Sequence, residues 1–506
     1  MLGIYETNIR TADSPGFEIF MGTSNLIEME NYPLKFEKPL PKWLKGTLLR
    51  NGPGRFGVGE RNFTNLLDGF AKGVSWNFPG DGSSYFSTKF LLSSCYNDSI
   101  KADDIATYLT IAPVNPPFTL EQKFKALWRN MDNLNVNVFN FTSDLVVLND
   151  VWTLYTIDGR RLEVLERVDA QLPGTYLGFP YMSHISTAHP LPEAGTGDHI
   201  TFIASIALLP GFRHKLTLVR VQSTKKREII AQWHLKKISY MHSFSVSQNY
   251  ALLIASPYYI DFNRMLRNMN IGKAMKWEKD EPSTIFVVHL KTGRVQSFDS
   301  ETMFSMHHVN AFEIDKFRLA MDVIAYKKAN SFSSISLSVL RNSTLRDAAA
   351  LPSKLKRYIV NLKTGNVSVK VFRNSSIQPE TAQIELPTIN EKYRSKRYCF
   401  AYTVLYKADN KSYSNMAIMK KDLCHKGGAS KDQSWSLRHH YVNEAWFVPR
   451  EGGVAEDDGL LLFPMMDGVN QVSYLAVLDA RTMTLVNKSK LPTNVPFTFH
   501  GRLFDI

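Results

Sequence analysis

The stretch Tyr358–Phe372, YIVNLKTGNVSVKVF, decides the fold class of this 506-residue chain. It has an apolar run, a polar turn and a second apolar run, which is the pattern of a β-hairpin. The same unit recurs at Thr153–Glu166, Phe286–Phe298 and Tyr474–Val486. Recurrence of one strand–turn–strand unit predicts an all-β protein, and a β-propeller in particular, because the blades of a propeller are antiparallel sheets. Two unrelated β domains in tandem are the alternative.

The composition agrees with one large folded unit. Hydrophobic residues make up 44% of the chain and charged residues 21%, which excludes global disorder. The aromatic content of 12% suits either a β-rich core or an apolar ligand tunnel. No linker or low-complexity tract divides the sequence, so we expect a single domain over residues 1–506.

The chain is basic, with a formal net charge of +13. Its Lys and Arg residues are scattered, and the sequence contains no zinc-finger spacing, RNA-binding aromatic motif or glycine-rich phosphate loop. We therefore expect no nucleic-acid partner, and no obligate protein partner is evident.

The cysteines and the apolar runs bear on the compartment. Cys95, Cys399 and Cys424 are odd in number and widely spaced, so we expect no disulfide framework and no metal knuckle. The N-terminal residues lack the apolar core of a signal peptide, and no run reaches the ~18 apolar residues of a membrane-spanning helix. We expect a cytoplasmic protein that lies peripheral to a membrane.

Two segments interrupt the β pattern with apolar residues at helical spacing. They are Pro117–Met131 and Asp261–Lys279, and both also carry several Lys and Arg side chains. Core packing is the usual explanation of such a stripe, but a basic amphipathic segment also suits a lipid interface. We expect these segments to attach the protein to one face of a membrane. The apolar residues of this expected membrane patch are Leu120, Phe124, Leu127, Trp128, Met265, Leu266 and Met269.

Four of the thirteen histidines lie beside small or apolar residues at the ends of expected strands. They are His189, His242, His307 and His500, and 53, 65 and 193 residues separate them in turn. In a propeller, such distant residues can converge on the axis, one from each of several blades. A ring of neutral imidazoles suits Fe, Zn or Cu. The alternative is four buried histidines that hydrogen-bond to the backbone. We expect other histidines, His199 among them, to be exposed or locally hydrogen-bonded.

An ordered series of short motifs resembles the carotenoid cleavage oxygenase family, from about residue 30 to the end of the chain. Each motif alone is weak, but the ordered set is specific. The motifs are GTLLRNGPGRF (Gly46–Phe56), LLDGFA (Leu66–Ala71), TAHP (Thr187–Pro190), SYMHSF (Ser239–Phe244), MHHVNAFE (Met306–Glu313), VNEAWFVPREG (Val442–Gly452), EDDGLLL (Glu456–Leu462) and PFTFHG (Pro496–Gly501).

The resemblance implies a seven-bladed β-propeller with a helical and loop cap over its active-site face. It also implies one non-haem Fe(2+) per chain on the propeller axis, held by four histidines. Residue by residue, these ligands are His189, His242, His307 and His500. The motif spacing selects His307 and not the adjacent His308.

The resemblance further implies carboxylates that accept hydrogen bonds from the ligand imidazoles. Two of them are Glu385 and Glu444, and the third position, usually Glu, is occupied by Asp150. Because Asp is one methylene shorter, a backbone shift, a bridging water or an alignment offset would have to explain it. A second departure is Leu134, which stands where cleaving members commonly have a Thr near the iron.

The activity that the resemblance implies is oxidative cleavage of a carotenoid double bond by dioxygen, which yields two retinal or apocarotenal aldehydes. Cleavage of the 15,15′ type is favoured. An iron with four protein ligands keeps room for dioxygen, and the apolar substrate would lie in a tunnel whose mouth faces lipid. The two departures favour the insect-type isomerooxygenase, which couples cleavage to trans–cis isomerisation and supplies a cis retinal for vision.

Two other functions stay open on the sequence. A non-cleaving relative would be a retinoid isomerohydrolase, which acts on retinyl esters without oxygen. A non-catalytic carotenoid-binding protein would have kept the fold alone. The sequence leaves undecided which carotenoid and bond are cut, the product geometry and the oligomeric state.

Overall fold

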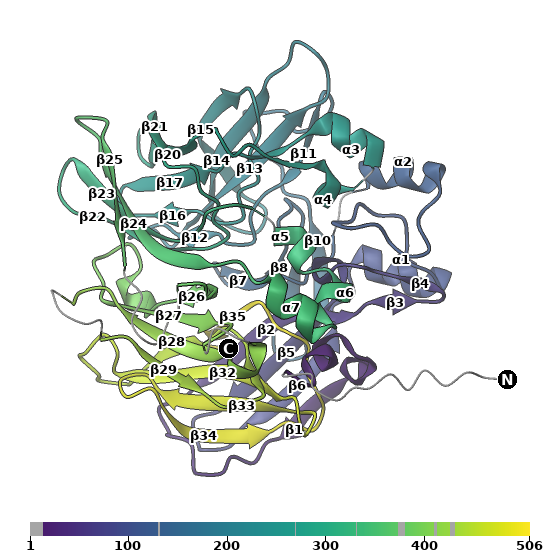
Figure 1. Cartoon of the computed structure of the whole chain (residues 1–506), viewed down its shortest axis with the longest axis vertical. Coiled ribbons are helices and arrows are strands. Elements are labelled where there is room, and N and C mark those ends of the chain that lie inside the picture. Colours follow the sequence, from purple (N-terminus) through teal and green to yellow (C-terminus); the bar gives the residue numbers. More distant parts are fainter. Residues whose placement is uncertain are drawn as a thin grey trace.

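The computed structural model describes residues 14–129, 132–268, 270–329, 331–372, 380–408, 412–425 and 431–506. Seven antiparallel sheets of four or five strands form the blades of a β-propeller (Figure 1). The predicted all-β class and the seven-bladed propeller are therefore confirmed.

The blades are numbered here by the order in which the chain enters them, and the strands of each are given in spatial order. Blade one comprises β1 (Met29–Pro33), β6 (Tyr85–Phe90), β5 (Phe70–Phe78), β2 (Gly46–Arg55) and β35 (His500–Phe504). Blade two comprises β10 (Glu163–Val168), β9 (Leu154–Asp158), β8 (Asp144–Leu148) and β7 (Asn137–Phe141). Blade three comprises β11 (Tyr181–Ile185), β13 (His199–Ala207), β14 (His214–Val221) and β15 (Arg227–Leu235), with β12 (Leu191–Pro192) also paired to β13.

Blades four to seven follow the same plan. Blade four comprises β16 (Ser245–Val246), β17 (Tyr250–Ala255), β20 (Ser283–His289) and β21 (Val295–Ser300), and blade five comprises β22 (His308–Glu313), β23 (Arg318–Tyr326), β24 (Ser353–Asn361) and β25 (Val367–Val371). Blade six comprises β26 (Ile384–Thr388), β27 (Phe400–Leu405), β28 (Ala417–Asp422) and β29 (Gln433–Ser436). Blade seven comprises β30 (His440–Val442), β32 (Gly459–Asp467), β33 (Val472–Asp479) and β34 (Thr484–Lys490), with β31 (Trp446–Pro449) also paired to β32. Two-stranded ribbons pair β3 (Gly57–Val58) with β4 (Arg61–Asn62) and β18 (Tyr258–Ile260) with β19 (Met275–Trp277).

The four hairpins recognised in the sequence form the outer strands of four blades: β9 with β10, β20 with β21, β24 with β25 and β33 with β34. In the two hairpins that share the KTG turn, Gly293 and Gly365 have φ of 68° and 77°. Residues with a Cβ rarely adopt this left-handed conformation, so the glycine permits the tight reversal.

The ring is closed by the two ends of the described chain. The C-terminal strand β35 pairs with β2, with His500 opposite Asn51 (Figure 1). Gly501 permits this pairing, because a Cβ at that position would lie 2.3 Å from the Leu49 carbonyl oxygen. Closure thereby places His500 beside strands that lie some 450 residues earlier in the sequence.

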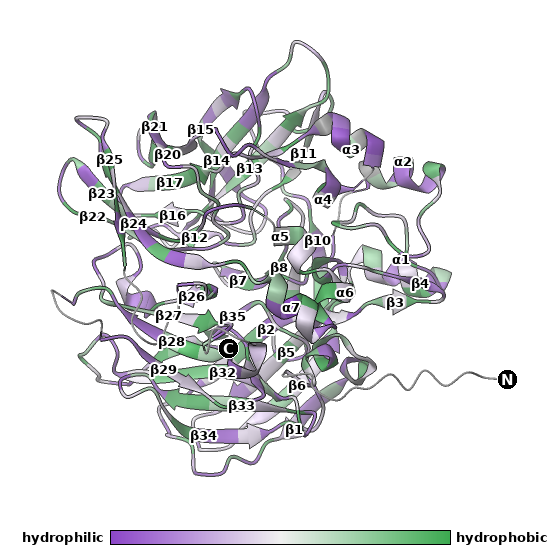
Figure 2. Ribbon diagram, viewed as in Figure 1, coloured by the Kyte–Doolittle hydropathy of each residue, from purple (hydrophilic) through white to green (hydrophobic). Residues whose placement is uncertain are grey.

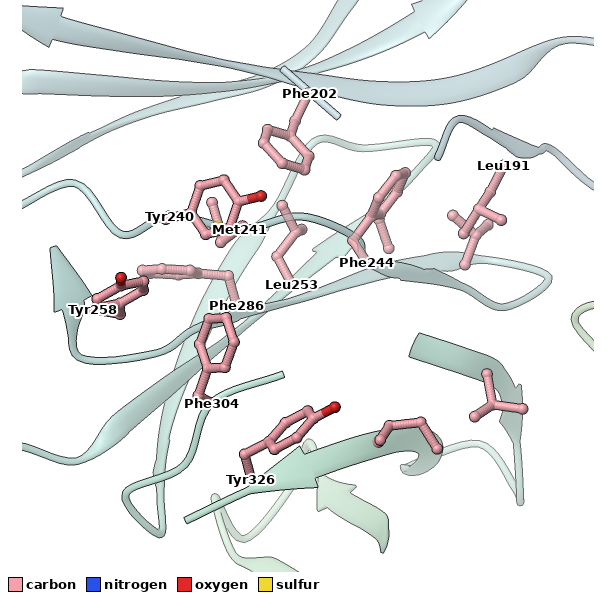
Figure 3. Close-up of a cluster of buried hydrophobic side chains, with 14 of the residues drawn as sticks. Leu191, Phe202, Tyr240, Met241, Phe244, Leu253, Tyr258, Phe286, Phe304 and Tyr326 are labelled. Carbon is pink, nitrogen blue, oxygen red and sulfur yellow. The ribbon is translucent and has the colours of Figure 1, made fainter. Parts of the chain in front are cut away.

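Apolar residues fill the interfaces between blades. Strand β32 is buried along its whole length and is largely hydrophobic (Figure 2). An aromatic cluster that includes Tyr240, Tyr258, Phe304 and Tyr326 packs between blades three, four and five (Figure 3).

The helices gather in one region of the molecule, on the right of Figure 1. They are α1 (Ser94–Ala102), α2 (Leu120–Trp128), α3 (Phe262–Asn268), α4 (Ile271–Ala274), α5 (Ser331–Ser334), α6 (Leu337–Leu340) and α7 (Ser343–Ala349). Elsewhere in the described chain there are 3₁₀ turns, at Phe17–Met21, Thr23–Leu26, Leu66–Asp68, Glu391–Tyr393 and Tyr413–Asn415.

The first of the two segments expected to be helical is confirmed as α2, which Thr119 begins with a capping box. The second is not one helix, because Asn270 separates the short helices α3 and α4 and caps α4, and the chain then enters strand β19. Within the described residues, no helix is both long and apolar enough to cross a membrane.

One cysteine expectation is wrong, because Cys399 and Cys424 form a disulfide. Cys399 immediately precedes β27, and Cys424 follows β28 by two residues. The antiparallel pairing of Phe400 with Asp422 brings the two cysteines together. The sequence separation of 25 residues gave no sign of this, because the register of the hairpin sets the distance.

Candidate metal centre

Four histidine side chains converge where the strands of several blades begin. His189, His242 and His307 each lie within three residues of the start of β12, β16 or β22, and His500 is the first residue of β35. Their potential ligand atoms all lie within 4.8 Å of one another. The structure thus brings together the four histidines selected from the sequence.

The spacing of the imidazole nitrogens fits a metal ion. The Nε2 atoms of His189 and His242 are 3.0 Å apart, and those of His307 and His500 are 3.1 Å apart. Two ligands at about 2.1 Å from a metal and at a right angle to each other would be separated by about 3.0 Å. Neutral imidazole nitrogens are good ligands for a divalent transition metal, so this group is a candidate metal centre.

Burial keeps two of these histidines neutral, which is the form that binds metal. The pKa values of His189 and His500 are both held well below the ordinary value, first by burial and then by the neighbouring histidine rings. The adjacent His308 is turned elsewhere, and its Nδ1 lies 2.9 Å from the Ser245 hydroxyl.

Glutamates orient two of the rings. Nδ1 of His307 donates to Glu385 at 2.5 Å, and Nδ1 of His500 donates to Glu444 at 2.7 Å. A carboxylate on Nδ1 fixes the tautomer that leaves the Nε2 lone pair free for a metal. These are the partners that the sequence analysis assigned to Glu385 and Glu444.

Asp150 contacts a third ring directly. Nδ1 of His242 lies 2.6 Å from Asp150 Oδ2, so neither a bridging water nor an alignment offset is needed. The other carboxylate oxygen of Asp150 accepts the backbone N–H of Ala188 at 3.0 Å. Among the described residues, no carboxylate lies within hydrogen-bond distance of His189.

Each carboxylate has a further donor that the sequence analysis did not identify. The hydroxyls of Tyr240 and Tyr326 donate to Asp150 at 2.8 Å and to Glu385 at 2.7 Å. Both tyrosines belong to the aromatic cluster of Figure 3, and burial raises the pKa of each well above its ordinary value. The position of Tyr240 two residues before His242, in SYMHSF, is the one sequence signal that could have revealed this role.

Arg50 is the corresponding neighbour of Glu444, and its guanidinium lies 3.5 Å from the carboxylate. Burial raises the pKa of Glu444 to about 7, and Arg50 opposes that rise. The pKa of Glu385, by contrast, is lowered: burial acts to raise it, but His307 and Tyr326 together outweigh burial.

Two apolar cavities meet beside the histidines. The larger, of about 1160 Å³, is bordered by His242, His307 and His500. The second, of about 800 Å³, reaches from His242 to Met265 on α3. Both are also lined by Leu67 and Val136 and by mostly hydrophobic side chains. The larger cavity is further lined by Phe17, Phe20, Phe304, Tyr326, Leu340 and Tyr413.

A third cavity, of about 660 Å³, borders His189, His307 and His500 and is more polar than the other two. Its walls carry Arg394 and Arg502 as well as serine, asparagine and glutamate side chains. We call it the polar channel. The histidine centre thus has apolar cavities and a polar channel as its neighbours.

Leu134 does not line any of these cavities, so the expectation of a leucine near the metal is wrong. Its side chain is fully buried among core residues of blades one and two, such as Leu49 and Leu91. Val136 lines both apolar cavities instead. Residues 132–136 precede strand β7, so the alternation of side chains in a strand does not apply to them.

The residues expected to form a membrane patch differ in their exposure to solvent. Leu120 and Phe124 on α2 are 80% and 56% exposed. Met265 on α3 is 1% exposed and lines the second apolar cavity, so its assignment to the surface is wrong. The exposed residues described on α3 are Asn263, Arg264 and Arg267, which are all hydrophilic. The side chains of Leu127, Trp128 and Leu266, and the whole of Met269, lie outside the described part of the chain.

His199 is also placed differently from expectation. It is buried on β13, with its ring centroid 5.8 Å from that of Phe139 and 5.3 Å from that of Phe141. Its Nδ1 has no hydrogen-bond partner among the described residues, and burial lowers its pKa to about 4.

Comparison with known proteins agrees with the site and the fold. The family model described as retinal pigment epithelial membrane protein (RPE65) matches residues 23–505. The chain is 28% identical to β,β-carotene 15,15′-dioxygenase of Mus musculus over 96% of this chain and 91% of the relative. It is 26% identical to the carotenoid isomerooxygenase of Galleria mellonella over 91% of each. The structure of a cobalt-substituted Synechocystis apocarotenoid oxygenase (ACO) superposes with a TM-score of 0.77, at 21% identity over 97% of this chain and 98% of that chain.

Proposed function

Because this chain belongs to the RPE65 family, we propose that it is an iron(II)-dependent dioxygenase that cleaves a carotenoid double bond to aldehydes. The observation that carries the proposal is the convergence of four histidines beside apolar cavities. Relatives named as carotenoid dioxygenases and as a carotenoid isomerooxygenase support oxidative cleavage, with the 15,15′ bond favoured. The retinal so formed would serve vision.

We assign the metal to the Nε2 atoms of His189, His242, His307 and His500. The cobalt-substituted relative supports a metal in this fold. Iron(II) held there would supply the redox chemistry that lets dioxygen react with a polyene double bond. In the overall reaction each oxygen atom ends in one of the two aldehydes, so no other oxidant is required.

The carboxylates orient the histidines and balance charge. A divalent ion on the histidines would favour the ionised form of Glu444. Asp150, Glu385 and Glu444 would then carry three negative charges, which match the ion and the guanidinium of Arg50. Loss of one carboxylate would leave an unbalanced positive charge in a buried site, at a cost that is large in a medium of low polarity.

The cavities position the substrate by shape, because a carotenoid polyene offers no hydrogen-bonding group along its chain. Leu67 and Val136, which line both cavities, mark the passage between them beside His242. A polyene that threads this passage would lie next to the metal and be shielded from water by the apolar walls. The position of the cut would depend on how much of the chain each cavity accepts.

We further propose that the protein attaches to one face of a membrane through α2. Leu120 and Phe124 offer exposed apolar area. The Arg129 carbonyl oxygen after α2 accepts the N–H of Leu109, and Leu109 and Ile111 both line the second apolar cavity. A carotenoid dissolved in lipid would therefore meet the protein close to this cavity.

The test is incubation of the iron-loaded protein with all-trans β-carotene in air, followed by chromatography that resolves chain length and isomer. Two retinal molecules per carotenoid are expected, and a cis product would indicate coupled isomerisation. Retinyl-ester turnover without oxygen uptake and with unchanged carotenoid would instead identify an isomerohydrolase. Tight carotenoid binding without product, at an iron content well below one per chain, would identify a binding protein.

A further inference from the structure

Arg502 holds its guanidinium in the wall of the polar channel, two residues after His500 on β35. The Cζ atom lies 3.7 Å from the ring centroid of Phe139 and 5.4 Å from that of Trp446. A planar guanidinium stacks on aromatic rings through its face, which leaves the N–H groups at its edge free to donate.

No hydrogen bond or ion pair links the Arg502 guanidinium to another side chain or backbone group of the described residues. The neighbouring Arg394 differs, because its donors are taken by Glu391 and by the Val309 carbonyl oxygen at 2.5 Å. Arg502 is half-buried in the channel wall, and an arginine so placed without an acceptor has N–H donors available to a ligand.

The acidic groups near Arg502 are already committed to other partners. Glu391 pairs with Arg394. Glu444 accepts from His500 and lies beside Arg50. With a divalent ion on the histidines, the remaining charges around the centre cancel, as described above. Arg502 is then the positive charge without a counterpart in the polar channel.

We propose that the polar channel binds a small monovalent inorganic anion, such as a halide, on the guanidinium of Arg502. The aromatic rings hold the guanidinium in place, so little conformational freedom is lost when an anion binds. The channel is more polar than the two apolar cavities, which suits a hydrated anion better than an apolar ligand. Besides Arg502, it is bordered by hydroxyl and amide side chains and by Glu391 and Glu444, which pair with Arg394 and Arg50.

The anion would be coupled to the metal centre through charge. Arg502 lines the same channel as His189 and His500, so its positive charge disfavours a cation at the histidines. An anion on Arg502 would offset that charge and strengthen divalent-metal binding, and the metal would strengthen anion binding by the same factor.

The direct test is bromide soaking of protein crystals, with location of the ion by anomalous scattering. Bromide is expected at hydrogen-bond distance from the Arg502 guanidinium in the wild type and absent in R502Q. The matched control is R318Q, which removes an exposed arginine paired with Asp315 and should retain the bromide. Peaks on the outer surface only, or water alone at Arg502, would overturn the proposal. This experiment does not depend on carotenoid cleavage.

A second measurement distinguishes the Arg502 site from a halide bound to the metal itself. Cobalt affinity of the metal-free protein is measured in sodium bromide and in sodium gluconate at equal ionic strength. The wild type and R318Q should bind cobalt at least about 5-fold more tightly in bromide. R502Q should lose this response yet bind cobalt at least as tightly as the wild type in gluconate. An equal bromide response in R502Q would refute the proposal, and R502K, which keeps the charge without the planar fork, covers the case in which R502Q does not fold.

Discussion

Nδ1 of His307 lies 2.5 Å from Glu385 Oε2, and both residues are buried. The other oxygen of Glu385 accepts the Tyr326 hydroxyl, and the backbone N–H of Leu386 donates to Oε2. The carboxylate therefore has a fixed orientation before any metal arrives. The His307 ring is fixed with it, so the orientation of this ligand is built into blades five and six.

Glu385→Gln is expected to weaken metal binding by about 10- to 100-fold, the usual effect of losing the partner of a ligand histidine. The amide is uncharged and can turn its NH₂ toward His307, which would disturb the tautomer. Cobalt titration of the metal-free protein measures the change. The control is Glu301→Gln, which removes a carboxylate that pairs with Lys356 and Tyr358 away from the centre. Equal affinities for E385Q and wild type would contradict the assigned role.

Asp150→Glu tests whether Asp at this position supports metal binding better or worse than the longer Glu that the family usually has. Because Asp150 already reaches His242 at 2.6 Å and also accepts the Ala188 N–H, an added methylene has to be accommodated by a shift. We expect D150E to bind metal more weakly than the wild type and to lose about 1–3 kcal/mol of stability. D150N should lose metal affinity without the crowding. If D150E instead bound cobalt more tightly, Asp150 would be a weaker partner for His242 than the usual Glu.

The hairpins and the four histidines were predictable for physical reasons. A glycine turn between two apolar runs, as in Tyr358–Phe372, is a local signal that does not depend on distant contacts. The histidines required the ordered motifs, because nothing local to His189 or His500 shows that they meet. Ring closure by β35 and β2 creates that proximity, and it is set by the whole fold.

Two of the incorrect expectations, those for Leu134 and Met265, share a cause in side-chain direction. Leu134 and Val136 precede a strand, so the alternation of a strand could not tell which of them faces the cavity. Met265 lies on a helix of seven residues, and its side chain faces the second apolar cavity and not the outside. The contact of Asp150 with His242 likewise depends on the path of the backbone after β8, which the sequence does not disclose.

Val136→Phe should block the passage between the two apolar cavities. The larger ring would occupy the space beside His242 that both cavities share, and a long polyene could not thread it. We expect cleavage of β-carotene to fall at least about 10-fold while iron content stays near the wild-type value. Leu134→Met, a volume-conserving change in the nearby core, should leave cleavage nearly unchanged. Full activity of V136F on β-carotene would show that the substrate takes another path.

His199→Phe should make the protein more resistant to acid. The native state holds His199 neutral with a pKa of about 4, whereas the unfolded chain takes up a proton near pH 6.5. Its contribution to stability is therefore complete above pH 6.5 and is lost as the pH falls toward 4. At 1.36 kcal/mol per tenfold change in proton affinity, this loss amounts to about 3 kcal/mol.

Urea unfolding of the wild type and H199F at pH 7.5 and at pH 4.5 measures this effect. The loss of stability between the two pH values should be smaller in H199F, which packs an uncharged ring between Phe139 and Phe141. His234→Phe is the control, because it replaces a histidine that is exposed on β15. Parallel pH profiles for all three proteins would exclude His199 as a source of acid sensitivity.

Membrane attachment through α2 predicts a surface effect without a change at the metal. Replacing both Leu120 and Phe124 with Asp removes exposed apolar area and adds two negative charges. We expect binding to phosphatidylcholine–phosphatidylserine vesicles to fall at least about 10-fold, with the iron content unchanged. Cleavage of carotenoid supplied in vesicles should fall in parallel, while cleavage of carotenoid supplied in detergent micelles should persist. Val454→Asp, on an exposed loop between β31 and β32, is the matched control. Vesicle binding equal to the wild type in the double variant would mean that α2 does not hold the protein on the membrane.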